Sequence, residues 1–291
     1  MRAPSSCDRR HFLRTGSAAV LGLSSLPKLL AAEDRKEDSF GGFKLGAQSY
    51  TFRQFNLESA LKQMKALGLH YVEFFPGHAP MTSNSNQIAA LKKLCAEYEI
   101  TPLAWGVQRF TKNTDENRKV FEFGKALGIK MFSANPDKDA FDSLDKLCDE
   151  YKIAIGIHPH GPYGKGQLDK WYSAEIILNA VKDHNPLIGS CLDTGHLIRA
   201  AQLGKKLEPA EQIRLMGDRN FGLHLKDHDN KELRDVVFGK GVLDVPAVLK
   251  ALRDVKFNGL ISIEYEANEK DPAPDVRDCV AVVKESVKKL G

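Results

Sequence analysis

Several patterns that would place a chain in a function class are missing from this sequence of 291 residues. The five cysteines lie far apart and form no CxxC pair, which excludes a zinc ribbon and a dense disulfide scaffold. No glycine-rich loop follows an early apolar segment, so an open nucleotide-binding sheet has no support. After residue 42 there is no low-complexity tract, no interdomain linker and no apolar run long enough to cross a membrane. We expect the cysteines of the chain body to be buried thiols.

A positive charge excess is also missing from most of the chain. The formal net charge is +4, but residues 1–32 alone hold five basic residues and one acidic residue. The other 259 residues therefore hold 37 basic and 37 acidic side chains. A neutral body has no field that steers it to polyanions, so we expect no nucleic-acid partner.

The N-terminus has the layout of an export signal. Arg9 and Arg10 precede His-Phe-Leu, a weakly apolar run of small residues covers 16–30, and Ala31-Ala32 comes before a charged stretch. The paired arginines resemble the twin-arginine signal, whose route carries folded proteins. We predict a signal peptide at 1–32, a linker at 33–43, and an exported, periplasmic protein without membrane association. The alternative is a basic N-terminus of a cytosolic protein.

Residues 44–291 alternate between short apolar runs and longer amphipathic stretches. Continuous apolar runs are typical of buried parallel strands, and apolar residues spaced by three and four indicate helices. Eight such alternations in about 250 residues predict an α/β fold, a single (β/α)8 TIM barrel. Strands are predicted at 45–51, 71–75, 100–107, 130–134, 153–158, 187–192, 221–225 and 260–265. Helices are predicted at 57–67, 86–99, 115–127, 140–151, 173–184, 197–203, 209–216, 245–255 and 275–289.

Four consecutive predicted strands end in ionisable side chains. These are His158, Asp193, His224 and Glu264. Barrel chemistry gathers at the C-terminal ends of the strands, so we expect all four on one rim. A polar residue near a strand end is usually just hydrogen-bonded, but four ionisable groups without a counter-charge would be costly to desolvate. Two imidazoles and two carboxylates favour one divalent metal ion, Mn²⁺, Co²⁺, Zn²⁺ or Fe²⁺, and the donors alone do not choose among them.

Several motifs resemble the xylose-isomerase-like TIM-barrel superfamily, which holds sugar phosphate isomerases and epimerases and the type-2 AP endonucleases. They are Asp193-Thr194-Gly195-His196, His224-Leu225-Lys226-Asp227, Gly239-Lys240-Gly241 and the strand ending in Glu264. By this resemblance Asp193, His224 and Glu264 match metal ligands. The sugar epimerases usually have Glu at the end of the fifth strand, where this chain has His158 in His-Pro-His.

The resemblance implies a metal-dependent isomerase or epimerase that removes a proton next to a metal-bound carbonyl of a sugar. In those epimerases, glutamates on strands five and eight act as opposed acid and base, and this chain keeps only Glu264. One-base chemistry therefore fits better: an aldose–ketose shift or, as the alternative, elimination by a lyase that acts on 3-oxo-glycosides. Weaker alternatives are a non-catalytic sugar-binding barrel and an AP-endonuclease-like phosphodiesterase.

Other polar and aromatic residues are predicted around this ring. Glu73 would bind substrate or act as a second acid/base, with a salt bridge in the barrel mouth as the alternative. His160, His196 and Lys226 would bind sugar hydroxyls or orient ligands. Trp105 would form an apolar sugar platform, with core packing as the alternative. A homo-oligomer is compatible with the sequence, which does not set the oligomeric state.

Overall fold

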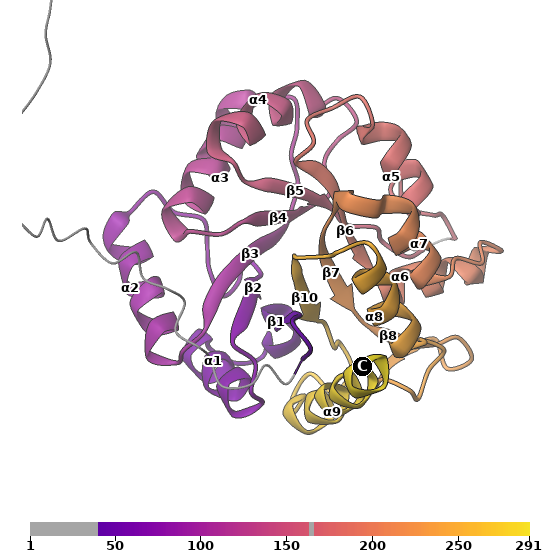
Figure 1. Cartoon of the computed structure of the whole chain (residues 1–291). Coiled ribbons are helices and arrows are strands. Elements are labelled where there is room, and N and C mark those ends of the chain that lie inside the picture. The colour runs from indigo at the N-terminus through magenta and orange to yellow at the C-terminus, as the bar shows by residue number, and fades with distance from the viewer. Residues whose placement is uncertain (1–39, 163–165) are drawn as a thin grey trace, which may run out of the picture. The chain divides into compact units, whose positions relative to one another are not determined.

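Eight short, apolar segments form the strands of a closed parallel barrel. The computed structural model describes residues 40–162 and 166–291. The barrel strands are β1 Lys44–Gln48, β2 Tyr71–Phe74, β3 Thr101–Gln108, β4 Met131–Ala134, β5 Ala154–Ile157, β6 Ile188–Asp193, β7 Asn220–Leu225 and β10 Leu260–Ile263. Their order around the barrel is β1-β10-β7-β6-β5-β4-β3-β2, and β1 pairs with both β10 and β2. Figure 1 shows the strands at the centre of a ring of helices. The predicted (β/α)8 barrel is confirmed.

Helices follow the strands and cover the outside of the barrel. They are α1 Leu57–Ala66, α2 Ser85–Glu97, α3 Thr114–Leu127, α4 Phe141–Tyr151, α5 Ala174–Val181, α6 Thr194–Arg199, α7 Pro209–Met216, α8 Val245–Asp254 and α9 Ala273–Leu290. Short 3₁₀ turns are η1 Ser49–Phe52, η2 Ala200–Leu203 and η3 Gly217–Arg219. Capping side chains mark where several helices begin. The Asn56 side chain accepts a hydrogen bond from the backbone amide of Ser59 at α1, and the Asn113 side chain caps α3 in the same way. Gly128 ends α3 in the left-handed conformation, with φ +92°.

The barrel interior is layered from apolar to polar along the strands. Near the N-terminal ends of the strands, a small apolar cluster fills the space, formed by Ala104, Met131, Ala154, Cys191 and Leu260. A fully buried polar layer contains Glu73, Ser133, Ser262 and His224, which hydrogen-bond to one another. The larger apolar core lies between strands and helices. Side chains at the C-terminal rim therefore stand on a packed base.

The hairpin that follows β7 was not predicted from the sequence. After β7, β8 Asp227–Asp229 and β9 Arg234–Val236 form an antiparallel hairpin beside the barrel rim. Within the described residues, no helix combines the length and apolar character needed to cross a bilayer. The predicted signal peptide at 1–32 lies outside the described residues and stays a prediction.

Candidate metal centre

Four side chains from neighbouring strands form a ring at the C-terminal rim. Asp193 and His224 lie in β6 and β7, and His158 and Glu264 follow β5 and β10 directly. His224 Nδ1 lies 3.1 Å from His158 Nε2 and 3.0 Å from Glu264 Oε2. Asp193 Oδ2 lies 3.5 Å from His158 Nε2 and 3.8 Å from His224 Nδ1. The structure thus brings together the four residues predicted to be metal ligands.

This ring fits a divalent cation. A tetrahedral site with bonds of about 2.0–2.1 Å spaces its donor atoms about 3.4 Å apart, close to the spacings in the ring. Asp193 Oδ1 accepts a hydrogen bond from the backbone of His196 at 2.7 Å and so caps α6. Its Oδ2 is buried and has no hydrogen-bond partner among the described residues. A buried carboxylate oxygen without a hydrogen bond is costly even when an ion pair lies nearby, and a cation at the ring would reduce that cost.

A buried lysine also faces the ring. Lys226 Nζ lies 2.9 Å from Glu264 Oε2 and 3.4 Å from Asp193 Oδ2, and it also pairs with Glu266. Burial would raise the pKa of Glu264, but the charges of Lys226 and His224 outweigh it and hold this pKa at about 2. For Asp193, burial is outweighed first by the charge of Lys226 and then by His196 and His158, which hold its pKa well below the usual value. Both ring carboxylates are therefore ionised at neutral pH, and Lys226 is placed to orient them.

Hydrogen bonds join the Asp193-Thr194-Gly195-His196 motif to the His224-Leu225-Lys226-Asp227 motif. Thr194 Oγ1 donates to Lys226 O at 2.7 Å and accepts from Lys226 N at 2.9 Å, which ties the start of α6 to the end of β7. Gly195 leaves room for the lysine stem, since an added Cβ would lie 2.7 Å from Lys226 Cγ and Cδ. Asp193 and His224 are paired in the sheet register. These contacts set the separation of the two ring residues.

Asp227 organises the loop that contains the Gly-Lys-Gly motif. Its carboxylate accepts hydrogen bonds from four backbone amides, those of His228, Gly239, Gly241 and Leu243, at 2.8–3.0 Å. A Cβ at Gly241 would lie 2.3 Å from Asp227 Oδ1, so only glycine allows this approach. The motif is therefore a structural clamp next to Lys226.

A model of the xylose isomerase-like TIM barrel family matches residues 61–285. The chain belongs to this family. A curated relative, the inosose isomerase of Bacillus velezensis, is 23% identical over 248 residues, which cover 75% of this chain and 86% of the relative.

Solved structures agree on the fold. A Parabacteroides distasonis protein is 28% identical with a TM-score of 0.65, covering 86% of this chain and all of the other. The D-psicose 3-epimerase of Clostridium cellulolyticum, solved with D-tagatose, is 15% identical with a TM-score of 0.67, covering 84% of this chain and 99% of the other.

Two further histidines border the ring of this xylose isomerase-like barrel. His160 and His196 have ring centroids 3.9 Å apart, and His196 meets His158 edge-on at 5.5 Å. Burial lowers the pKa of both His160 and His196, so their imidazoles are neutral at neutral pH. Arg199 lies 3.3 Å from His196 Nδ1. The structure thus places both predicted substrate-binding histidines beside the ring.

Glu73 does not lie where it could bind a substrate. It is fully buried in the polar layer of the barrel, with Oε2 2.9 Å from His224 Nε2, on the side of the imidazole away from the ring. The structure does not place it where it would touch a sugar or act as a second acid/base. The alternative reading, an ion pair within the barrel, matches the contact with His224.

Trp105 does not face the barrel mouth. Its side chain is 2% exposed, packs edge-on against Phe123 and Phe132, and donates from Nε1 to Ala79 O at 2.8 Å. Phe123 belongs to α3, so Trp105 points outward into the helix layer. The platform prediction for Trp105 is therefore corrected to core packing.

Aromatic side chains that the sequence reasoning missed lie after β1 and β2. Tyr50 is 36% exposed and meets Phe75 edge-on at 5.5 Å, with the Arg53 guanidinium 4.6 Å from the Tyr50 ring. Both aromatic residues lie in the last two positions of a predicted strand, 45–51 or 71–75, and that position was the signal available in the sequence. They offer an apolar wall on the same rim as the ring.

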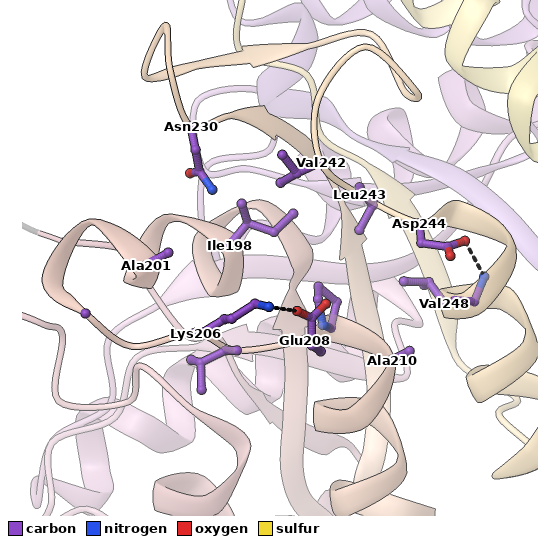
Figure 2. A pocket seen from close by; sticks show the side chains of 14 residues that line it. Ile198, Ala201, Lys206, Glu208, Ala210, Asn230, Val242, Leu243, Asp244 and Val248 are labelled. Carbon is purple, nitrogen blue, oxygen red and sulfur yellow. Dashed lines mark hydrogen bonds and ion pairs between the residues drawn. The ribbon is translucent and has the colours of Figure 1, made fainter.

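A separate cavity lies behind α6. It has a volume of about 490 Å³ and lies between the α6–α7 segment, the β8–β9 hairpin and the start of α8. Figure 2 shows Ile198 and Val242 lining it, with the Lys206–Glu208 ion pair on one side. None of the predicted site residues lines this cavity. The chemistry of the ring, not the size of this cavity, therefore locates the candidate active site.

Proposed function

We propose that this protein is a metal-dependent enzyme of sugar isomerisation that removes a proton next to a substrate carbonyl. The observation that carries the proposal is the ring of two imidazoles and two carboxylates with the unsatisfied Asp193 Oδ2 at its edge. The similarity to an inosose isomerase over three quarters of the chain supports a keto sugar or keto cyclitol as substrate.

The four ring residues would hold the ion, and Mn²⁺, Co²⁺, Zn²⁺ or Fe²⁺ suits this mixture of nitrogen and oxygen donors. When bound, the ion would polarise the substrate carbonyl and acidify the neighbouring C–H group. His160 and His196 border the ring and would bind hydroxyls of the sugar, and Lys226 would orient the ring carboxylates. Tyr50 and Phe75 would contact the apolar face of its carbon skeleton.

Glu264 is the proposed base. Its Oε2 makes the contacts with His224 and Lys226, whereas Oε1 has no hydrogen-bond partner among the described residues. The side chain is 8% exposed at the rim, so Oε1 can reach a bound sugar. Glu264 would take the proton from the carbon next to the carbonyl and return it to the neighbouring carbon in an aldose–ketose shift.

Elimination from a 3-oxo-glycoside is the second candidate. Two-base epimerisation needs an acid/base group on each face of the reacting carbon. His158 stands where the resembling epimerases have a glutamate, and its Nε2 faces the ring. Glu73 is buried below the ring and does not supply a replacement. A single base is enough for an aldose–ketose shift and for removal of a proton followed by loss of the glycosidic oxygen.

Deuterium exchange distinguishes these functions. The Mn²⁺- or Co²⁺-loaded protein would be incubated in D₂O with an inosose, D-tagatose or a 3-oxo-glucoside, and products would be followed by NMR. We expect deuterium next to the carbonyl with at least one probe, and a decrease of at least about 100-fold in Glu264→Gln. Loss of the aglycone would identify the lyase. Full exchange in Glu264→Gln would remove Glu264 from the base role, and binding without exchange for any probe would favour a non-catalytic barrel.

A further inference from the structure

The Glu73 carboxylate is surrounded by hydrogen-bond donors from four strands. Gln48 Nε2 donates to Oε1 at 3.0 Å, and Ser133 Oγ donates to the same oxygen. Ser262 Oγ donates to Oε2 at 3.0 Å, and His224 Nε2 lies 2.9 Å from Oε2. All of these side chains are buried. The environment is built for a group that only accepts hydrogen bonds, which is a carboxylate.

This contact decides which nitrogen of His224 would keep its proton when an ion is bound. An ionised carboxylate has no proton to donate, so His224 Nε2 must carry the hydrogen in the short contact with Glu73. Without an ion, Nδ1 faces the ionised Glu264 carboxylate and can carry a proton as well; an ion at the ring would take the place of that second proton and meet the Nδ1 lone pair. Nδ1 is the His224 atom that faces the ring, 3.0 Å from Glu264 Oε2 and 3.1 Å from His158 Nε2.

We propose that Glu73 is a positioning residue of the metal centre, which holds the His224 imidazole protonated at Nε2 and so directs the Nδ1 lone pair into the ring. This assignment rests on the metal site of the proposed function. When a carboxylate accepts a hydrogen bond from the nitrogen of a ligand histidine that does not bind the metal, it sets the orientation of the imidazole and increases the basicity of the other nitrogen. Ser133 and Ser262 in turn hold the carboxylate in place.

A competing role for Glu73 does not fit. Glu73, Cys191 and His224 also form a group whose donor atoms are close enough for an ion. Four donors already occupy the two oxygens of Glu73, which matches the roughly four lone-pair sites of a carboxylate. Glu73 therefore supports a ligand and is not itself one.

The decisive variant is Glu73→Gln. The glutamine amide is neutral and has one acceptor oxygen in place of two. If its NH2 group turns toward His224, the imidazole must carry its proton on Nδ1, where it blocks the ring; if its oxygen turns toward His224, a neutral acceptor replaces the carboxylate and increases the basicity of the imidazole less. We expect the dissociation constant for Co²⁺, measured from visible absorption, to rise by about 10- to 100-fold.

Ser262→Ala is the matched control, because it removes one donor to the same oxygen and leaves the imidazole contact intact. Its Co²⁺ affinity should stay within about threefold of the unsubstituted protein. Far-UV circular dichroism of the metal-free proteins would verify that both variants are folded. Co²⁺ affinity in Glu73→Gln equal to that of the unsubstituted protein would overturn the assignment.

A second measurement needs no change at Glu73. In the Zn²⁺-loaded protein, ¹⁵N NMR should find the proton of His224 on Nε2, with the signal assigned from its loss in His224→Gln. A proton on Nδ1 would overturn the assignment even if Glu73→Gln does not fold. If the unsubstituted protein binds neither Co²⁺ nor Zn²⁺, the proposed metal centre itself is wrong, and that result differs from a failure of Glu73 alone.

Discussion

At the residue scale, three of the four ring side chains engage neighbouring residues through one polar atom and leave the other for the site. Asp193 caps α6 with Oδ1 and turns Oδ2 to the ring. His224 binds Glu73 through Nε2 and presents Nδ1. Glu264 engages its neighbours through Oε2. The ring geometry is therefore held by contacts that leave one polar atom of Asp193, His224 and Glu264 for chemistry.

His158 is expected to set the metal preference. Replacing it with Glu exchanges an imidazole for a carboxylate and should shift the ratio of Mn²⁺ to Zn²⁺ affinity toward Mn²⁺ by roughly tenfold. Competition titrations would measure this ratio. His160→Gln, which changes a neighbouring imidazole outside the ring, is the control. An unchanged ratio in His158→Glu would show that His158 does not bind the ion.

The buried thiols are expected to make the folded protein less stable at alkaline pH. Burial raises the pKa of Cys95, Cys148 and Cys279 to about 12 and that of Cys191 to about 11. Unfolded cysteine has a pKa of about 8.5, so the folded state favours the neutral thiol. This contribution is complete below about pH 8.5 and is lost as the pH rises toward 12.

Urea unfolding at pH 7 and pH 10 would measure this loss. Cys148→Ala should lose less stability between the two pH values than the unsubstituted protein does. An equal loss would show that the Cys148 thiol does not contribute. At pH 7 the four thiols should resist iodoacetamide in the folded protein, which peptide mass spectrometry can follow.

At the element scale, the sequence was informative where one physical rule decides the structure. Buried parallel strands are continuous apolar runs and helices carry apolar residues every three or four positions, so all eight strand–helix units were predictable. The same rule does not show which strand residues face inward, because both faces are apolar, and for this reason the sequence left Trp105 open between a sugar platform and core packing. The β8–β9 hairpin was missed because its strands have three residues each and no apolar pattern.

The hairpin and the Gly-Lys-Gly loop are expected to depend on Asp227. Asp227→Ala leaves four backbone amides without their carboxylate and should lower the free energy of unfolding by on the order of 3 kcal/mol. Hydrogen exchange at Gly239, Gly241 and Leu243 should accelerate. The control is Asp229→Ala at the end of β8, a half-buried aspartate whose carboxylate accepts from the amides of Lys231 and Glu232 and not from the Gly-Lys-Gly loop. Exchange as slow as in the unsubstituted protein would contradict the role of Asp227.

At the scale of the whole molecule, the net positive charge and the candidate active site lie in different parts of the chain. The entire net positive charge belongs to residues 1–32, and the barrel that follows is neutral. We propose that this segment directs export by the twin-arginine route. Arg9→Lys with Arg10→Lys should keep the protein inside a bacterial host, as measured by fractionation. Export as efficient as that of the unsubstituted chain would contradict this proposal.

Metal-dependent stability tests the central claim most directly, because an ion that binds only the folded ring must stabilise the fold. At 100 times the dissociation constant, Co²⁺ or Mn²⁺ should add about 2.7 kcal/mol and raise the Tm by roughly 5–10 °C. Asp193→Asn keeps the oxygen that caps α6 but loses the charge on Oδ2, so it should abolish this rise. An unsubstituted protein that contains no divalent metal and whose Tm does not change with added ions would contradict the account.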